Sequence, residues 1–178
     1  MSQHARLLRE VPIFGAIRED IIDFLLQKGR EHQVRQGDWV LREGDAGGSM
    51  FVIDHGEVAV LKSHEGRQYL LNTLRDGDCI GEMALFDLMP RSASVLALSR
   101  VTLLEIDGSA LHELYKRDIE QFALIQMNMG REVTRRLREC EAHIFRKLDY
   151  PEFDPGPDSS DPLTETNLEW PGRLPLHP

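Results

Sequence analysis

Glycine residues divide the middle of this chain into short apolar segments, and this spacing restricts the fold more than any other feature. Eight glycines lie between residues 31 and 107, and the segments between them are rich in Val, Ile, Leu, Phe and Tyr. Turn pairs such as Asp76-Gly77 separate the segments, because glycine adopts positive φ and aspartate bonds its own backbone. Short strands at this spacing are typical of an antiparallel sandwich or barrel. The strands do not alternate with helices, which excludes a Rossmann fold.

Two stretches show what kind of strands these are. Val58 and Val60 alternate with Glu57 and Ala59, which is the pattern of a half-buried strand. The run at 50–53 is apolar throughout, as expected of a strand that is covered on both faces. The β core is therefore expected over about residues 31–107.

Helical patterns flank this β core. Apolar residues repeat at helical spacing over 21–26, and residues 109–148 predict a longer helical segment with Ser109 as N-cap and Asp118 as a second cap. An apolar stripe then continues at steps of three and four, formed by Phe122, Ile125, Met129, Val133, Leu137, Cys140, Ile144 and Leu148. Such a stripe packs on the protein's own sheet or on a second helix. Because the segment outruns the β core, we expect a homodimer through residues 118–148.

The composition restricts the class of protein. The chain has 178 residues and a net charge of −9, so the total shows no electrostatic footprint for nucleic acid. No apolar run approaches the length of a membrane span, and the start has no signal-peptide pattern. The two cysteines, Cys79 and Cys140, form neither a disulfide framework nor a zinc pattern. These observations favour a cytoplasmic protein without membrane contact and without a metal.

Residues 149–178 differ in composition from the rest. They hold seven of the nine prolines, and seven acidic residues against one basic residue. Proline lacks a backbone donor, so a long helix or central strand is excluded there. The segment is either a solvated extension or a tail whose apolar residues dock on the body or on a partner, these residues being Leu163, Leu168, Trp170, Leu174 and Leu176.

The segment at 80–95 carries the groups for a ligand site. Gly81 allows a close backbone approach, and residues 82–85 predict one or two helical turns that Pro90 ends. The N–H groups at such a helix start favour an anion, and Arg91 offers a guanidinium suited to phosphate. A carboxylate would repel that anion, so Glu82 is expected to accept hydrogen bonds from sugar hydroxyls. A site with a phosphate pole (Arg91) and a hydroxyl pole (Glu82) fits a nucleotide.

This segment resembles the phosphate-binding cassette of the cyclic nucleotide-binding domain family, which includes catabolite activator-type regulators, kinase regulatory subunits and gated channels. A second family signature matches at 43–56, and the resemblance covers about residues 5–148. It implies a mainly β fold, an antiparallel β-roll (double-stranded β-helix or jelly roll) with N-terminal helices and a long C-terminal helix. The cassette signature reads aliphatic-Gly-Glu-x-small-aliphatic, a spacer, then Arg-small-Ala, and it is filled by Ile80, Gly81, Glu82, Ala84, Leu85, Arg91, Ser92 and Ala93.

The resemblance also implies roles for single residues. Arg91 is expected to bind the cyclic-phosphate oxygens, Glu82 to accept from the ribose 2′-hydroxyl, and Gly81 to lie beside the ribose. The remaining expected contacts are backbone amides of the cassette and two residues where the sheet faces the base, namely Met83, Ala84, Ser92, Ala93, Leu71 and Asn72.

The identity of the base stays open, with cAMP first and cGMP second. In kinase-type relatives, threonine after the arginine favours cGMP and alanine favours cAMP, but this chain has Ser92. Activator-type relatives read adenine with a Thr-Ser pair on the long helix, and the string at 135–137 aligns so that Cys140 and Glu141 stand at that pair. Arg136 matches a helix arginine that lies near the ribose glutamate in these relatives, and it is a third candidate for contacts around the base. Glu141 could accept from adenine or guanine, and Cys140 could equally be a seam residue.

The resemblance implies a regulatory protein that senses a cyclic mononucleotide and signals to an unknown protein partner by changing conformation. Catalysis is not expected, because no nucleophile–base pair or metal cluster occurs, and the ligand is the only small molecule expected. No helix-turn-helix pattern follows Leu148, so the expected arrangement is a stand-alone sensor that does not bind DNA, with a domain at 1–148 and a tail at 149–178. The alternative is a ligand-free dimeric scaffold of the same fold.

Overall fold

The computed structural model describes residues 3–147, and their side chains from residue 6 to residue 142. The helices are α1 (Gln3–Glu10), the short 3-10 helix η1 (Pro12–Phe14), α2 (Glu19–Lys28), α3 (Glu82–Phe86), α4 (Gly108–Arg117) and α5 (Ile119–Lys147). The strands are β1 (Arg30–Val34), β2 (Trp39–Leu41), β3 (Ser49–His55), β4 (Glu57–His64), β5 (Arg67–Arg75), β6 (Cys79–Ile80), β7 (Ser94–Ala97) and β8 (Val101–Asp107).

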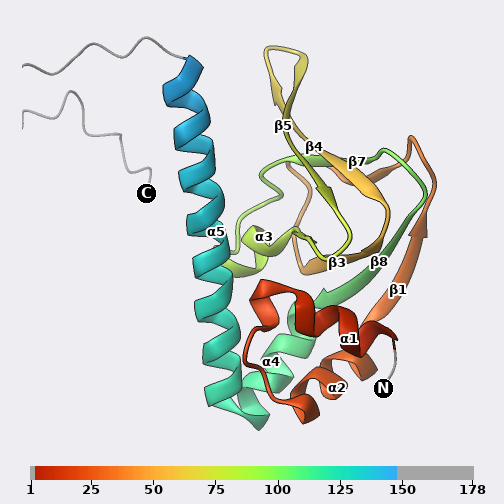
Figure 1. The fold of residues 1–178 in the computed structure, drawn as a ribbon, viewed down its shortest axis with the longest axis vertical. Coiled ribbons are helices and arrows are strands. Elements are labelled where there is room, and N and C mark those ends of the chain that lie inside the picture. Colours follow the sequence, from red (N-terminus) through yellow and green to blue (C-terminus); the bar gives the residue numbers. More distant parts are fainter. Residues whose placement is uncertain (1–2, 148–178) are drawn as a thin grey trace, which may run out of the picture. The chain divides into compact units, whose positions relative to one another are not determined.

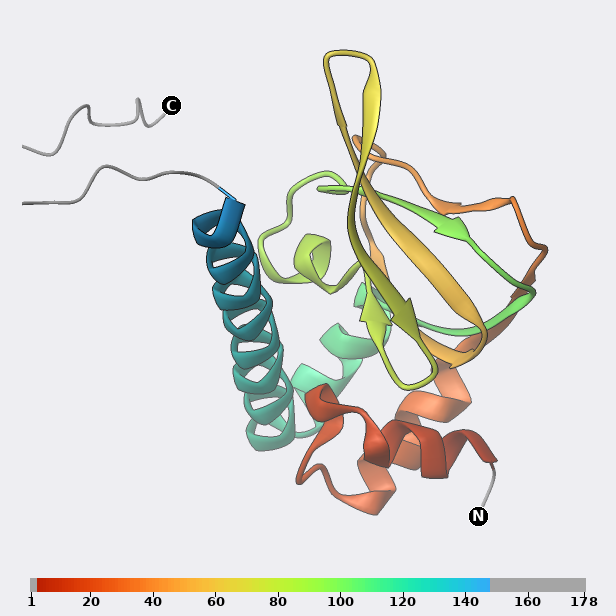
Figure 2. The same cartoon turned by 45° about the horizontal axis from the view of Figure 1, so that its top comes forward.

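These strands form two antiparallel sheets (Figures 1 and 2). One sheet has the order β1-β8-β3-β6 and the other has the order β2-β7-β4-β5. The β4–β5 hairpin contains a bulge, because Val60 pairs with Asn72 whereas Leu61 pairs with Leu70. The predicted mainly β fold, with N-terminal helices before the roll and a long helix after it, is confirmed.

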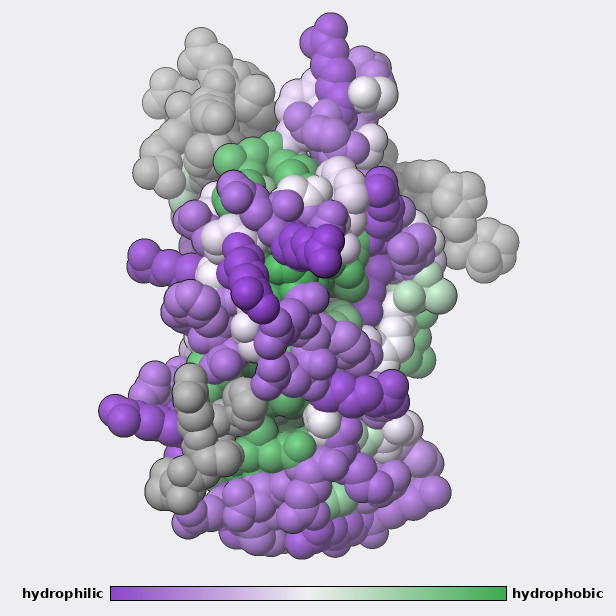
Figure 3. Space-filling view, turned by 90° about the vertical axis from the view of Figure 1, so that its right-hand side faces the viewer, coloured by the Kyte–Doolittle hydropathy of each residue, from purple (hydrophilic) through white to green (hydrophobic). Residues whose placement is uncertain are grey.

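The central strand β3 separates two apolar cores, as its uninterrupted apolar run predicted. Met50 and Val52 belong to a core that the helices share, whereas Ile53 belongs to a second core formed by residues of both sheets. Outside these cores, the face of the molecule in Figure 3 shows mostly hydrophilic residues with separate apolar patches between them. No helix within residues 3–147 combines the length and the apolar composition that a membrane span requires.

The apolar stripe of α5 divides into two parts. Ile125 and Met129 are fully buried and belong to the core that the helices share. Further along, Leu137 is 58% exposed and Cys140 is also exposed. The first part of the stripe therefore packs on the protein's own core, whereas Leu137 and Cys140 in the second part are left exposed by the described residues.

Two predicted helix boundaries were wrong. Asp107, not Ser109, is the N-cap of α4, because its side chain accepts from the backbone N–H of Ala110 at 2.8 Å. The helical turns predicted at 82–85 are confirmed as α3, but they end at Phe86 rather than at Pro90. The next residues turn through Leu88, which has a positive φ of 59°. The predicted cap at Asp118 is confirmed by its hydrogen bond from the Gln121 N–H.

The chain divides into two units, Met1–Cys140 and Glu141–Pro178. The described part of the second unit is the end of α5, residues 141–147. The predicted tail at 149–178, with its candidate docking residues, lies outside the described residues. All of the site described below belongs to the first unit.

Candidate functional site

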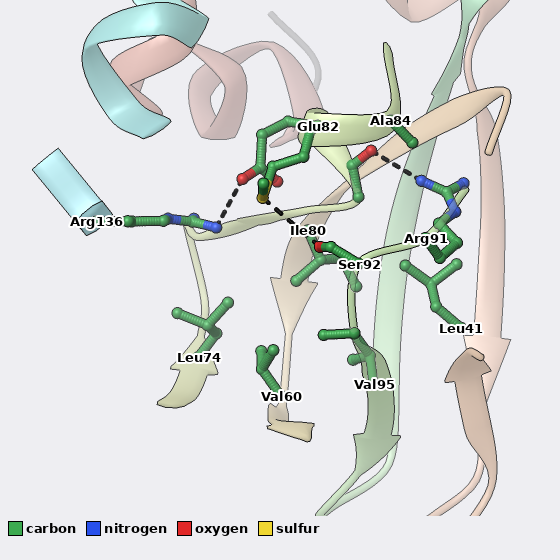
Figure 4. A pocket seen from close by; sticks show the side chains of 13 residues that line it. Leu41, Val60, Leu74, Ile80, Glu82, Ala84, Arg91, Ser92, Val95 and Arg136 are labelled. Atoms are coloured by element: carbon green, nitrogen blue, oxygen red, sulfur yellow. Dashed lines mark hydrogen bonds and ion pairs between the residues drawn. The ribbon is translucent and has the colours of Figure 1, made fainter. Parts of the chain in front are cut away.

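The cassette borders a pocket that opens between α3, the loop after it, the second sheet and α5 (Figure 4). About 440 Å³ of space open to solvent lies between its walls. The lining residues are Leu41, Val60, Leu74, Ile80, Gly81, Glu82, Met83, Ala84, Arg91, Ser92, Ala93, Val95 and Arg136. All of the predicted cassette contacts therefore meet at one pocket. The residues whose side chains the structure describes hold no cluster of His, Cys, Asp and Glu suited to a metal ion.

Gly81 sets the geometry of the cassette. Its φ of 77° lies in the left-handed region, which lets β6 turn directly into α3. A Cβ at this position would overlap the Nη1 atom of Arg91. The backbone conformation thus favours glycine here, and any side chain at this position would also have to displace the guanidinium.

Arg91 is held in place by the upstream signature predicted at 43–56. Its backbone N–H donates to the Asp45 carbonyl at 2.8 Å, and its own carbonyl accepts from the Gly44 N–H at 2.9 Å. Next to this contact, a Cβ on Gly47 would overlap the Cβ of Ala84, so the Gly47 backbone packs directly against the methyl group of Ala84 on α3. The two family signatures therefore meet in space and fix the phosphate pole together.

The side chain of Arg91 is buried without a carboxylate partner. Only 6% of the residue is exposed, and its Nη1 donates to the Gly81 carbonyl at 2.8 Å. Among the described residues it forms no ion pair within 4.0 Å. Burial lowers the pKa of Arg91, although Glu105, Glu82 and Asp45 act against this shift through space. A buried cation of this kind can bind an anion that enters the pocket.

Glu82, at the hydroxyl pole, is also buried but is paired. It is 2% exposed, and its Oε1 accepts from Nη1 of Arg136 on α5 at 2.9 Å (Figure 4). Burial raises the pKa of Glu82, and the Arg136 guanidinium opposes that rise. The carboxylate is thus directed into the site by a cation from the long helix, as the alignment through Arg136 implied.

Apolar residues from the sheet form the opposite wall. Leu74, Val60, Val95 and Leu41 lie below the polar groups in Figure 4. The sequence analysis named none of them as site residues, since their pattern marks them only as strand residues. The pocket thus combines charged groups on one side with an apolar surface that suits a flat base or a sugar edge on the other.

Four predicted base contacts are not among the pocket's lining residues. Leu71 is the bulged residue of β5 and is 53% exposed, and Asn72 is also exposed. Cys140 is exposed at the end of the first unit, and the exposed Glu141 belongs to the second unit. Their roles in reading the base stay predictions.

Comparison with known proteins agrees with this geometry. Residues 31–118 match the profile of the cyclic nucleotide-binding domain. These residues belong to the cyclic nucleotide-binding domain family. The family is one of regulatory ligand-binding domains rather than of catalytic ones. A solved cyclic nucleotide-binding domain from Methylobacillus flagellatus kt has the same fold, with a TM-score of 0.74 at 24% identity over 85% of each chain.

Two relatives show how widely this domain is used. The cyclic AMP receptor protein of Thermus thermophilus is 28% identical over 134 residues, which are 75% of this chain and 60% of that protein. A cGMP-dependent protein kinase of Toxoplasma gondii is 33% identical over 111 residues, which are 62% of this chain and 11% of the kinase. The chain therefore spans less than two thirds of either relative.

Proposed function

We propose that this chain is a regulatory protein that binds cAMP or cGMP in the pocket of Figure 4. The observation that carries the proposal is that one pocket holds a buried guanidinium without an ion-pair partner in the described residues and a buried carboxylate at its other end. A cyclic mononucleotide has the matching groups, a single negative phosphodiester and a ribose hydroxyl. The names of the two relatives, one for each purine, support this ligand class.

Each polar group has one task in this proposal. Arg91 donates to the exocyclic phosphate oxygens, and the backbone of Met83, Ala84, Ser92 and Ala93 surrounds the rest of the phosphate. Glu82 accepts from the ribose 2′-hydroxyl, and Gly81 leaves room beside the sugar. The base then lies toward the apolar wall, whose Leu and Val side chains have no hydrogen-bonding groups that would distinguish adenine from guanine.

The signal leaves the pocket through the long helix. Arg136 joins Glu82 to α5, so a ligand that engages the carboxylate also changes the environment of the helix. A ligand shifts the conformation only if it binds the two states unequally. We infer that the second part of the apolar stripe, at Leu137 and Cys140, responds by packing on a second copy through the helix at 118–148 or on a protein partner.

Calorimetric titration of the full chain with cAMP and with cGMP tests the function. We expect binding in the micromolar range or tighter for at least one of them. Arg91→Gln should weaken binding by about two decades, or about 3 kcal/mol, since charge-assisted bonds to the phosphate are lost. Arg100→Gln is the matched control, because Arg100 is exposed and pairs with Gln33 outside the pocket.

Two outcomes would contradict the proposal in different ways. Equal affinity in Arg91→Gln and the wild type would place the ligand elsewhere. The absence of heat and of thermal stabilisation with both nucleotides would favour the ligand-free scaffold, and sedimentation of the full chain would then show whether that scaffold is a dimer.

A further inference from the structure

Glu132 is a buried carboxylate of α5 that lies beside the pocket without lining it. It is 6% exposed and borders a separate small hollow with Val11, Pro12 and Ile13. Its two oxygens accept from Arg135, at 2.6 Å for Nη2 and at 3.1 Å for Nε. Its Oε1 also accepts from the Nε of Arg136 at 2.8 Å. Because the Glu132 carboxylate is buried and accepts three hydrogen bonds from guanidinium groups, its orientation is fixed.

Arg136 in turn depends on three acceptors from three elements. Its Nε donates to Glu132 within α5, its Nη1 to Glu82 of α3, and its Nη2 to the Cys79 carbonyl of β6 at 2.8 Å. An arginine side chain has several rotatable bonds and does not keep one conformation unless contacts fix it. The bond to Glu132 is the one that fixes the guanidinium from its own helix, one turn back.

We propose that Glu132 is a positioning residue for the ribose-binding carboxylate. It holds Arg136 in the orientation that directs Glu82 toward the ribose 2′-hydroxyl, and so sets how strongly the site prefers a ribonucleotide. This inference rests on the proposed function. Glu132 itself touches no ligand, since it lies outside the lining of the pocket.

The charges around Glu132 are consistent with this role. Burial acts to raise its pKa, but hydrogen bonds from Arg135 and the charge of Arg136 outweigh it, so the pKa of Glu132 is lowered and the group stays ionised. Glu82 and Glu132 both pair with Arg136, so one positive charge would face two negative ones. Arg135 also pairs with Glu132 and supplies a second positive charge. The buried carboxylates Glu82 and Glu132 thus face two guanidiniums before any ligand binds, and the exposed Glu139 also pairs with Arg135.

The test compares ribonucleotide and 2′-deoxyribonucleotide binding in the full chain. The probes are cAMP and cGMP with their 2′-deoxy analogues, measured by calorimetry. We expect the wild type to bind the ribo form about tenfold more tightly or better, as one hydrogen bond to a charged group provides. Glu132→Gln should reduce this ratio at least threefold, which is about half of the free energy of a tenfold preference.

Glu139→Gln is the matched control. Glu139 also pairs with Arg135 and lies on the same helix, but it is exposed and makes no bond to Arg136 in the described structure. This variant should keep the wild-type ratio. Because the ratio compares two ligands on one sample, a loss of folded protein does not change it, so a merely structural role of Glu132 would leave it unmoved.

Each result decides between the two proposals. A wild type that binds the ribo form and discriminates, with an unchanged ratio in Glu132→Gln, overturns the role of Glu132 and leaves the proposed function intact. A wild type that binds neither nucleotide overturns both. If Glu132→Gln does not fold, Glu132→Asp keeps the charge on a shorter side chain, and an unchanged ratio there overturns the role equally.

Discussion

Two arginines, the buried Arg91 and the half-buried Arg136, line the same pocket and are held in opposite ways. Arg136 donates to Glu82, Glu132 and the Cys79 carbonyl, so its charge is neutralised within the protein. Arg91 donates to the Gly81 carbonyl and forms no ion pair with any described residue. The hydroxyl pole is therefore complete without a ligand, whereas the phosphate pole has a charge that an incoming anion would neutralise. Folding alone therefore pairs the charges at the hydroxyl pole, whereas the charge at the phosphate pole is paired only when an anion binds.

The largest expected effect is on folding, and it separates the two arginines. Arg136→Met leaves Glu82 buried without its cation, which costs about 3 kcal/mol or more of the free energy of unfolding. Arg91→Met leaves no carboxylate unpaired and removes one bond to a carbonyl, which costs about 1 kcal/mol. Urea unfolding of both variants without ligand measures the difference.

Arg138→Met is the control for that comparison. Arg138 is an exposed arginine of the same helix, so its replacement should change the free energy of unfolding by less than about 0.5 kcal/mol. Similar losses in Arg136→Met and Arg91→Met would show that the two poles do not differ in the way their contacts indicate.

The cassette residues were easier to predict from the sequence than Glu132, the buried carboxylate that pairs with Arg136. Gly81, Glu82 and Arg91 lie within eleven consecutive residues, so one local signature predicts them together. Glu132 carries no such signal, because a glutamate on a helix is usually exposed and only the approach of Arg135 and Arg136 explains its burial. Local motifs reveal groups that are near in the chain, and buried ion pairs depend on tertiary packing.

The same distinction explains the other differences. The spacing of apolar residues in α5 predicted that one face of the helix is covered. This spacing does not determine which residues are covered, and in the structure Ile125 packs in the protein's own core while Leu137 is exposed. The bulge in β5 leaves Leu71 without a pairing partner, and Leu74 lines the pocket instead. A bulge depends on the register between two strands, which their separate patterns do not determine.

A smaller effect is expected from the glycine contact behind the phosphate pole. A Cβ on Gly47 would overlap Ala84, so Gly47→Ala must push the loop away from α3 and should cost about 1–3 kcal/mol of stability. Because the same loop bonds the backbone of Arg91, nucleotide affinity should fall with it. Thermal unfolding and calorimetry measure the two effects.

The neighbouring glycine provides the control. A Cβ on Gly48 would meet nothing within 4 Å, so Gly48→Ala should leave stability and affinity close to those of the wild type. If the two variants behave alike, the close packing of loop and helix is not what positions Arg91.

The smallest expected effect is on pH dependence, because the carboxyl at the hydroxyl pole titrates whereas the guanidinium at the phosphate pole stays charged. The affinity for a cyclic ribonucleotide should fall as the pH is lowered through the raised pKa of Glu82, since the protonated group is a weaker acceptor. The affinity for the 2′-deoxy analogue should stay level over the same range. Calorimetric titrations at a series of pH values measure both.

The free energy of unfolding of the ligand-free protein should also depend on pH through Glu82, independently of nucleotide binding. The pKa of Glu82 is raised above its ordinary value of 4.5, so the folded protein holds this proton more tightly than the unfolded chain does. Glu82 therefore contributes stability that is fully present below pH 4.5 and is lost as the pH rises through its folded pKa. This part of the pH dependence should vanish in Glu82→Gln and persist in Arg91→Gln. A Glu82→Gln curve that runs parallel to the wild type through that window would mean that burial of the carboxylate does not govern the hydroxyl pole, and the contrast between the two poles would lose its electrostatic basis.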